Sequence, residues 1–300
     1  MNLPKKIHFT CPDKDNISNS IWVECLDEYY KIYKDYEIIL YDDNDIYDVI
    51  EKHFPQFLNQ VKQITIGAII SDLFRYLILY LEGGIYSDLD CLPLKHINSL
   101  LDENYIYYHG DKDRDNNFYL YNRNQKINNN KWDFHHNICD NSKFIGESGG
   151  IKIMKCLGHK IDIKNTSTIL SYELHKDWNG GDKLRNNRLA YKGVGIAQWF
   201  IMTEPKQDVF LKMFMYCMDN VEKLTKLKQT EEQKDTYHYD VISTSGPLAF
   251  TKMVIDNISD NIKILPSDFF CNGSWGEVPL TENSFVTHKF TSSWVDTSWI

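Results

Sequence analysis

The chain lacks the features of a zinc-cysteine, secreted or membrane-spanning protein. Its seven cysteines are scattered and form no Cys-x-x-Cys pair, which argues against a structural zinc site and fits reduced thiols. No apolar run approaches the roughly 18 residues that a transmembrane helix needs. The N-terminus carries no apolar signal-peptide core. We therefore expect a cytoplasmic, soluble protein, or one peripheral to a membrane.

Basic charge is also scarce, because 33 Lys and Arg residues face 42 Asp and Glu residues, for a net charge of -9. A general nucleic-acid binder needs a basic face, so we expect no nucleic-acid partner. A nucleotide held through a metal ion stays compatible with this charge. The 300 residues suffice for one large domain with a substantial core. Without internal repeats or a clear linker, a single domain with insertions is the simplest organisation.

Alternating strand-like and helical segments in the first third of the chain predict an α/β fold. Strands are expected at residues 5–10, 36–43 and 85–90, and helices at residues 20–35, 45–53 and 66–81. This order is typical of a mostly parallel sheet with helices on both faces. In such sheets ligands bind at the carboxyl ends of the strands.

The rest of the chain is less regular. Residues 111–137 are polar and rich in Asn, which indicates a loop or an insertion. Further on, a helix is expected at residues 206–228, a turn leading into a helix at residues 243–258, and a short strand at residues 261–266. The tail begins like a strand and holds His288.

Two carboxylates end the most apolar part of the chain. Asp88 and Asp90 lie on the predicted strand after Gly83-Gly84, and residues i and i+2 of a strand face the same side. An Asp-x-Asp triplet is common in exposed turns, but exposed turns seldom follow so apolar a segment. Two convergent carboxylates favour Mg²⁺ or Mn²⁺ bound together with substrate phosphates. His288 is a third ligand if the tail folds back over the site.

A charged pair interrupts the preceding apolar helix. Asp72 and Arg75 are three residues apart and share a helical face. They could form a structural ion pair, but buried ion pairs are a weak source of stability. A bound polar ligand accounts for them better, with Arg75 on a phosphate or sugar hydroxyls and Asp72 on a sugar. Tyr86 shares the face of the carboxylates and fits a core or a site role equally.

These segments together resemble a known family. "PKKIHFT", "YEIILYDDND", "AIISDLFRYLILYLEGGIYSDLDCLPL", "SGP" and "HKFTSSW" occur in the order found in the DXD glycosyltransferases of family 32. Those enzymes resemble yeast-type Golgi mannosyltransferases and bacterial capsule sugar transferases, and their core is similar to that of the clostridial glucosylating toxins. The likeness spans both ends of the chain, is densest over residues 68–94, and is loose in the middle.

The resemblance implies a GT-A fold, which is a Rossmann-like mixed and mostly parallel sheet, here with a helical or irregular insertion. Residues 1–101 would form the nucleotide-sugar core, residues 102–240 a variable acceptor-side region and residues 241–300 a closing segment. It also implies Mn²⁺ or Mg²⁺, held by Asp88, Asp90 and His288, and transfer of a hexose with retention. A UDP-sugar is favoured as donor and GDP-mannose is the other option. The acceptor would be a glycan, a lipid-linked sugar or a protein.

The family pattern also assigns roles to individual residues. The catalytic set it implies is Asp72, Arg75, Asp88 and Asp90. The donor-binding set it implies is Phe9, Thr10, Asp72, Arg75, Tyr86, Asp88, Ser293 and Trp294. The first strand of the family usually runs into a Trp that stacks on the base, whereas this chain has "HFTCP", so Phe9 or a neighbour would take that place.

Two other functions fit parts of the pattern. A Mg²⁺-dependent phosphohydrolase would use Asp88 as nucleophile and Asp90 as acid, but Cys91-Leu92-Pro93 fits the expected continuation poorly. A non-catalytic carbohydrate-binding protein could keep a degenerate transferase fold, since a fold alone does not establish activity. Metal-dependent turnover of a nucleotide sugar separates these hypotheses.

Overall fold

The computed structural model describes residues 1–101, 106–107, 142–148, 151–156, 159–160, 166–174, 194–226, 240–265, 269–270, 280 and 283–291. The helices are α1 (Ser20–Ile32), α2 (Asp43–His53), α3 (Leu58–Val61), α4 (Gly67–Glu82), α5 (Asn98–Leu101), α7 (Asp208–Asp219), α8 (Val221–Lys226) and α10 (Pro247–Asp256), with a 3-10 turn at Pro55–Phe57. The strands are β1 (Lys6–Thr10), β2 (Glu37–Tyr41), β3 (Gly84–Ser87), β4 (Cys91–Pro93), β5 (Ile106–Tyr107), β6 (Ser142–Ser148), β7 (Ile151–Cys156), β8 (His159–Lys160), β9 (Thr168–Leu174), β10 (Val194–Ile196), β11 (Phe200–Thr203), β12 (Ile262–Leu265) and β13 (Val286–His288).

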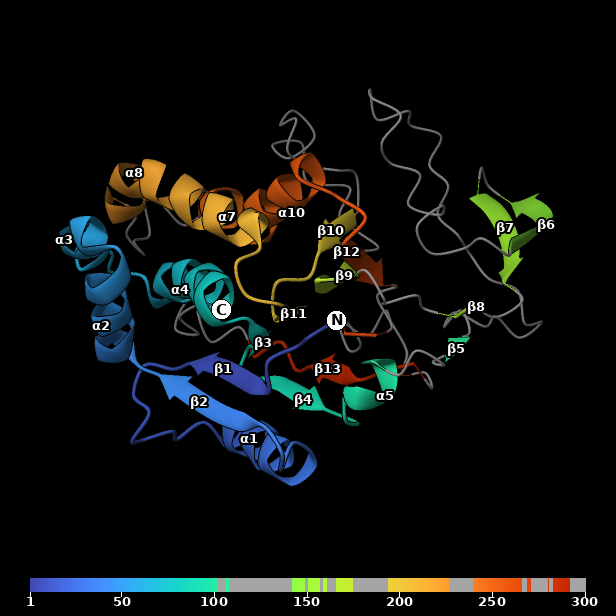
Figure 1. Cartoon of the computed structure of the whole chain (residues 1–300), viewed down its shortest axis with the longest axis horizontal. Helices are drawn as coiled ribbons and strands as arrows, with labels where there is room; N and C mark the ends of the chain where they lie inside the picture. The colour runs from blue at the N-terminus through green and yellow to red at the C-terminus, as the bar shows by residue number, and fades with distance from the viewer. Residues whose placement is uncertain are drawn as a thin grey trace.

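A seven-stranded mixed sheet organises the molecule (Figure 1). Its order is β10-β9-β11-β3-β1-β2, and β12 pairs with β9. The pairs β1–β2, β1–β3 and β12–β9 are parallel, whereas β11 is antiparallel to both of its neighbours and β10 is antiparallel to β9. The expected α/β fold with a mixed sheet is confirmed. Its strands come from residues 6–10 at one end of the chain and residues 262–265 at the other.

Helices cover both faces of this sheet, as predicted. Strand alternation sends Ile85 into the core cluster that holds α1 and α5, and sends Tyr86 into the cluster that holds α2, α4, α7 and α10. Figure 1 shows α4, α7 and α10 on one side of β1 and β2, and α1 on the other. Helix α4 packs directly against α7, which removes most of its outer surface from water. No helix in the described part of the chain is long and apolar enough to cross a membrane.

Local sequence explains where the helices begin and end. The Asn19 side chain caps α1, and Asp42 and Asp45 form a capping box at α2. Gly83, with φ of 64°, ends α4 in a conformation that favours glycine. Pro247 opens α10, where its missing N–H costs no hydrogen bond.

Two predicted elements differ from the structure. The strand expected at residues 85–90 ends at Ser87, so Asp88 and Asp90 lie in a turn and strand alternation does not align them. The helix expected at residues 206–228 is split into α7 and α8 at Asn220. Asn220 ends α7 because its side-chain amide donates to the Tyr216 carbonyl at 2.8 Å and so competes with the helical backbone. The expected single domain with three regions stays a prediction.

Candidate functional site

The turn after β3 places the two aspartates at the carboxyl edge of the sheet. The backbone N–H of Asp88 donates to the Trp199 carbonyl at 2.8 Å, just before β11 begins. The Cys91 N–H then donates back to the Asp88 carbonyl at 3.1 Å, which closes the turn. Strand β4 follows and pairs antiparallel with β13, with Cys91 opposite His288. Two segments almost 200 residues apart in the chain therefore meet beside Asp90.

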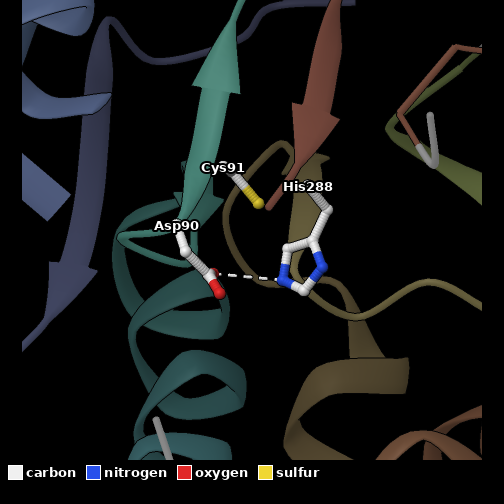
Figure 2. Close-up of side chains that lie close together, drawn as sticks. All are labelled: Asp90, Cys91 and His288. Atoms are coloured by element: carbon white, nitrogen blue, oxygen red, sulfur yellow. Dashed lines mark ion pairs between the residues drawn. The ribbon is translucent and has the colours of Figure 1, made fainter. Parts of the chain in front are cut away.

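Asp90 and His288 form the centre of this site. Their side chains point toward one another (Figure 2), Asp90 from the turn just before β4 and His288 from the end of β13, with 3.1 Å between His288 Nε2 and Asp90 Oδ1. Both side chains are about one-tenth exposed. Burial would raise the pKa of the Asp90 carboxyl, but hydrogen bonds from His288 and Thr291 outweigh burial and lower that pKa to about 2. Asp90 is therefore ionised at any ordinary pH.

Aromatic rings hold the His288 imidazole in place. It stacks on the Trp199 indole with 4.7 Å between ring centroids, and the edge of Phe290 meets it at 3.9 Å. The Trp199 indole is itself fixed, because Nε1 donates to the Phe270 carbonyl at 2.9 Å. His288 Nδ1 is buried and has no hydrogen-bond partner in the described parts of the chain. A rigid imidazole is suited to binding a ligand, and Nε2 is the nitrogen that faces Asp90.

The donor atoms fit a divalent cation. Two ligands at roughly 2.1 Å from one ion, at a right angle, lie about 3 Å apart, which is close to the Asp90–His288 separation. A carboxylate with one imidazole suits Mn²⁺ better than a thiolate set would. Cys91 lies with Asp90 and His288 in one cluster of possible metal ligands. Its buried thiol donates to the Trp199 carbonyl, however, and burial holds the pKa of the thiol well above the usual value. A protonated thiol is a poor metal ligand.

Asp88 lies outside this cluster and pairs with the helix instead. Arg75 Nη2 lies 3.2 Å from Asp88 Oδ1 and 3.2 Å from Asp72 Oδ1. Asp72 and Arg75 are 5% exposed at the side chain, whereas Asp88 is 28% exposed and open to a ligand. Burial raises the pKa of Asp72 to about 6, against the effect of Arg75. Burial opposes the charge on Arg75, but Asp88 and Tyr86 hold its pKa above the usual range.

The Asp72–Arg75 pair has polar partners that the sequence analysis did not assign to it. Gln198 Nε2 donates to Asp72 Oδ1 at 3.0 Å, and the Gln198 carbonyl accepts from Arg75 Nη1 at 2.9 Å. Ser245 Oγ donates to Asp72 Oδ2 at 2.8 Å, and the Tyr76 hydroxyl bonds both Gln198 Oε1 and the Ser245 carbonyl. Gln198 is a single polar residue inside the apolar run "GIAQWFIM", and this position was the signal in the sequence that could have identified it. Arg75 Nε remains without a partner in the described parts of the chain.

Hydroxyl groups cluster around Tyr86, whose ring lies against Arg75. The Tyr86 ring lies under the guanidinium, 4.6 Å from the ring centroid to Cζ. Its hydroxyl is 3.0 Å from both Thr10 Oγ1 and Ser71 Oγ. The structure thus brings together Thr10, Tyr86, Arg75 and, through Arg75, Asp72 and Asp88. Ser71 is an addition that the sequence analysis did not name.

Phe9 corrects one expectation about the donor site. Its side chain is fully buried on the α1 side of the sheet, where its ring meets Tyr29 edge-on at 4.9 Å. Strand alternation turns Phe9 away from the face that carries Thr10 and Tyr86, so its ring cannot stack on a base. Ser293 and Trp294, the other expected donor contacts, lie outside the described residues.

Comparison with known proteins identifies a segment that carries part of the candidate site. Residues 20–107 match the family model described as the glycosyltransferase sugar-binding region containing DXD motif. The resemblance to DXD glycosyltransferases is thereby confirmed. The matched residues run from α1 through α4 and the Asp88–Asp90 turn, and they leave out Gln198, Ser245 and His288.

Curated relatives agree with the family match. The chain is 36% identical over 88 residues to inositol phosphoceramide mannosyltransferase 3 of Schizosaccharomyces pombe, which is 29% of this chain and 24% of that protein. It is 33% identical over 88 residues to mannosyl phosphorylinositol ceramide synthase SUR1 of Saccharomyces cerevisiae, which is 29% of this chain and 22% of that protein. The matched segments thus span about a quarter of these relatives.

A solved structure is similar over more of the chain. The catalytic domain of alpha-toxin from Clostridium novyi aligns with 98% of this chain and 80% of its own, at 14% identity and a TM-score of 0.43.

Proposed function

We propose that the protein is a metal-dependent glycosyltransferase that moves a hexose from a nucleotide sugar to a hydroxyl acceptor. The observation that carries the proposal is the Asp90–His288 pair, set at the carboxyl edge of the sheet beside the Arg75–Asp88 pair. A divalent cation and a buried guanidinium together suit a nucleoside diphosphate leaving group, which is anionic. The DXD region over residues 20–107 supports this chemistry.

Each side chain has a role in the proposed reaction. Asp90 and His288 would hold the cation, which when bound stabilises the negative charge that develops on the diphosphate. Arg75 would contribute a second positive charge through its unpartnered Nε, held in position by Gln198 and Asp72. Asp88 is more exposed than its partner Arg75 or than Asp72, and it would accept hydrogen bonds from the nucleotide-sugar donor. Retention at the anomeric carbon belongs to the proposal through the family resemblance alone.

The transferred sugar is proposed from the relatives. Two of them are named for mannosyl transfer, so mannose is the first candidate, with other hexoses as alternatives. The base of the donor is open between uracil and guanine, because Phe9, which was expected to stack on it, is buried. The acceptor is proposed only as a glycan, lipid-linked or protein hydroxyl.

The test is release of nucleoside diphosphate from a panel of UDP- and GDP-hexoses with Mn²⁺. Wild-type protein is expected to turn over one donor, and EDTA is expected to abolish turnover. Asp90→Asn should lower the rate about 100-fold or more, because charge stabilisation of a leaving group has at least that magnitude. Cys91→Ala is the matched control, since the thiol lies in the same cluster but hydrogen-bonds to Trp199. No turnover and no donor binding by wild type would refute the proposal and favour a non-catalytic fold.

A further inference from the structure

The chain after β13 folds back onto Asp90. The Lys289 N–H donates to the Asp90 carbonyl at 2.8 Å. Two residues later, Thr291 donates twice to the same carboxylate oxygen, Asp90 Oδ2, from its backbone N–H at 3.0 Å and from Oγ1 at 2.9 Å. Because His288 approaches the other oxygen, Oδ1, each end of the carboxylate has its own partner.

An unusual backbone conformation makes this contact possible. Phe290 has φ of 48°, in the left-handed region that residues with a side chain rarely adopt. Its ring packs edge-on against His288 and lies 5.5 Å from the Trp199 ring, also edge-on. The aromatic contacts compensate for the strained conformation, and the resulting turn brings Thr291 back to Asp90. Strain of this kind persists where the surrounding structure requires it, often at functional sites.

The two hydrogen bonds from Thr291 control the orientation of the Asp90 carboxylate. The terminal torsion of an Asp side chain is broad, so an unrestrained carboxylate samples many rotations. With Oδ2 fixed by two donors, Oδ1 is directed at His288 Nε2. Hydrogen-bond partners that orient a ligand typically change metal affinity by about 10- to 100-fold when they are removed.

We propose that Thr291 is a positioning residue for the divalent-cation site, and that it holds Asp90 so that Oδ1 is the ligating oxygen. This inference rests on the proposed function insofar as Asp90 and His288 bind the cation. It goes beyond that function by assigning a role to Thr291, a residue to which the proposed function gives none. A merely structural role for Thr291 would change the melting temperature and leave the metal affinity unchanged.

The experiment measures Mn²⁺ affinity directly, by the electron paramagnetic resonance signal of free Mn²⁺ in titrations of the full chain. Thr291→Val removes the hydroxyl donor, keeps the shape and keeps the backbone N–H. Thr291→Ser keeps the hydroxyl and removes only the methyl group. We expect Thr291→Val to raise the Kd for Mn²⁺ about 10-fold or more, and Thr291→Ser to match wild type. Equal melting temperatures for the three proteins would exclude a general loss of structure.

Other outcomes are decisive as well. Equal Mn²⁺ affinity for wild type and Thr291→Val would overturn the inference and leave the proposed transferase function standing. Equal weakening by Val and Ser would also overturn it, because the methyl group and not the hydroxyl would then be responsible. Wild-type protein that neither binds Mn²⁺ nor turns over any nucleotide sugar would refute the proposed function itself, and this inference with it.

Discussion

At the scale of single residues, the two buried aspartates of the site in the described part of the chain each have several partners. Asp72 has Arg75, Gln198 and Ser245, and Asp90 has His288 and Thr291. Isolated buried charges are costly, so such networks form where the charges have a use beyond stability. The two networks meet at Asp88, which pairs with Arg75 and lies two residues from Asp90.

His8 is a buried ionisable group with a structural role. It is fully buried on β1, with Nε2 3.0 Å from the Gly83 carbonyl and Nδ1 3.1 Å from the Tyr41 hydroxyl. A carbonyl only accepts, so Nε2 carries the proton and Nδ1 accepts from Tyr41. Burial lowers the pKa of His8 to about 4, and the neutral imidazole therefore predominates in the folded protein.

This gives a prediction for acid stability. The unfolded chain binds the His8 proton near pH 6.5, whereas the folded protein binds it only near pH 4, so folding excludes the proton between these values. The His8 contribution is complete above pH 6.5 and is lost as the pH falls toward 4, for a total of roughly 3 kcal/mol. Urea unfolding of wild type and His8→Gln at several pH values measures the difference. Identical pH dependence in the two proteins over this range would contradict the prediction.

At the scale of elements, the junction between α4 and β3 determines where the site lies. Gly83 and Gly84 both have positive φ, at 64° and 92°. A Cβ on Gly84 would lie 2.7 Å from the Lys6 carbonyl oxygen, and a Cβ on Gly83 would lie 2.5 Å from Pro205 N. The glycines therefore allow β3 to pack closely against β1. The same junction connects β3 to α4, which carries Asp72 and Arg75.

Gly84→Ala should be strongly destabilising for this reason. Positive φ and contact with a main-chain oxygen act together, and we expect a loss of at least about 1–3 kcal/mol in the free energy of unfolding. Gly67→Ala is the matched control, because nothing lies within 4 Å of a Cβ at that position in the first turn of α4. There alanine should stabilise by up to about 1 kcal/mol through its better helix propensity. Denaturant unfolding of both variants measures the contrast, and similar losses at the two positions would refute the steric argument.

Element patterns also show what the sequence could and could not predict. Periodicity and the Gly83-Gly84 pair located α1, α4 and β1 to within a few residues, because each depends on local chemistry. The carboxylates at Asp88 and Asp90 were placed on a strand, but β3 ends at Ser87 and a turn follows, closed by the Cys91 N–H on the Asp88 carbonyl. The Asp88 N–H bonds the Trp199 carbonyl, 111 residues away in the chain, and local pattern could not reveal that contact.

In the candidate site, too, some residues could be predicted from the sequence and others could not. Asp72, Arg75, Asp90 and His288 were identified in advance, and the structure brings them to one edge of the sheet. Gln198, Ser245 and Thr291 were not assigned to the ionic networks, because a neutral polar residue gains its role only from the charge that folding places beside it. The stacking role expected of Phe9 or a neighbour does not suit Phe9, because its ring is buried in the core beside α1, a packing that the sequence does not state.

At the scale of the whole molecule, the family region depends on the rest of the chain. Residues 20–107 match the family model, yet β3 in that region hydrogen-bonds to β11, and α4 is covered by α7 from beyond it. His288, the partner of Asp90, also comes from outside. Ten side chains of α4 are buried, including Phe74, Leu77 and both members of the ion pair.

The segment of residues 1–101 alone should therefore fail to fold cooperatively. Each Leu, Ile or Phe side chain of α4 that loses its cover costs about 1.5–3 kcal/mol, and a few of them equal the whole stability of a typical domain, about 5–15 kcal/mol. Circular dichroism of the fragment in increasing urea should show a gradual loss of helix, whereas the full chain should show one sigmoidal transition. The fragment should also bind Mn²⁺ far more weakly, because Asp90 would lack both His288 and Thr291. A cooperative transition in the fragment would mean that β11 and α7 are dispensable, and that the site is built on a smaller folding unit than the mixed sheet indicates.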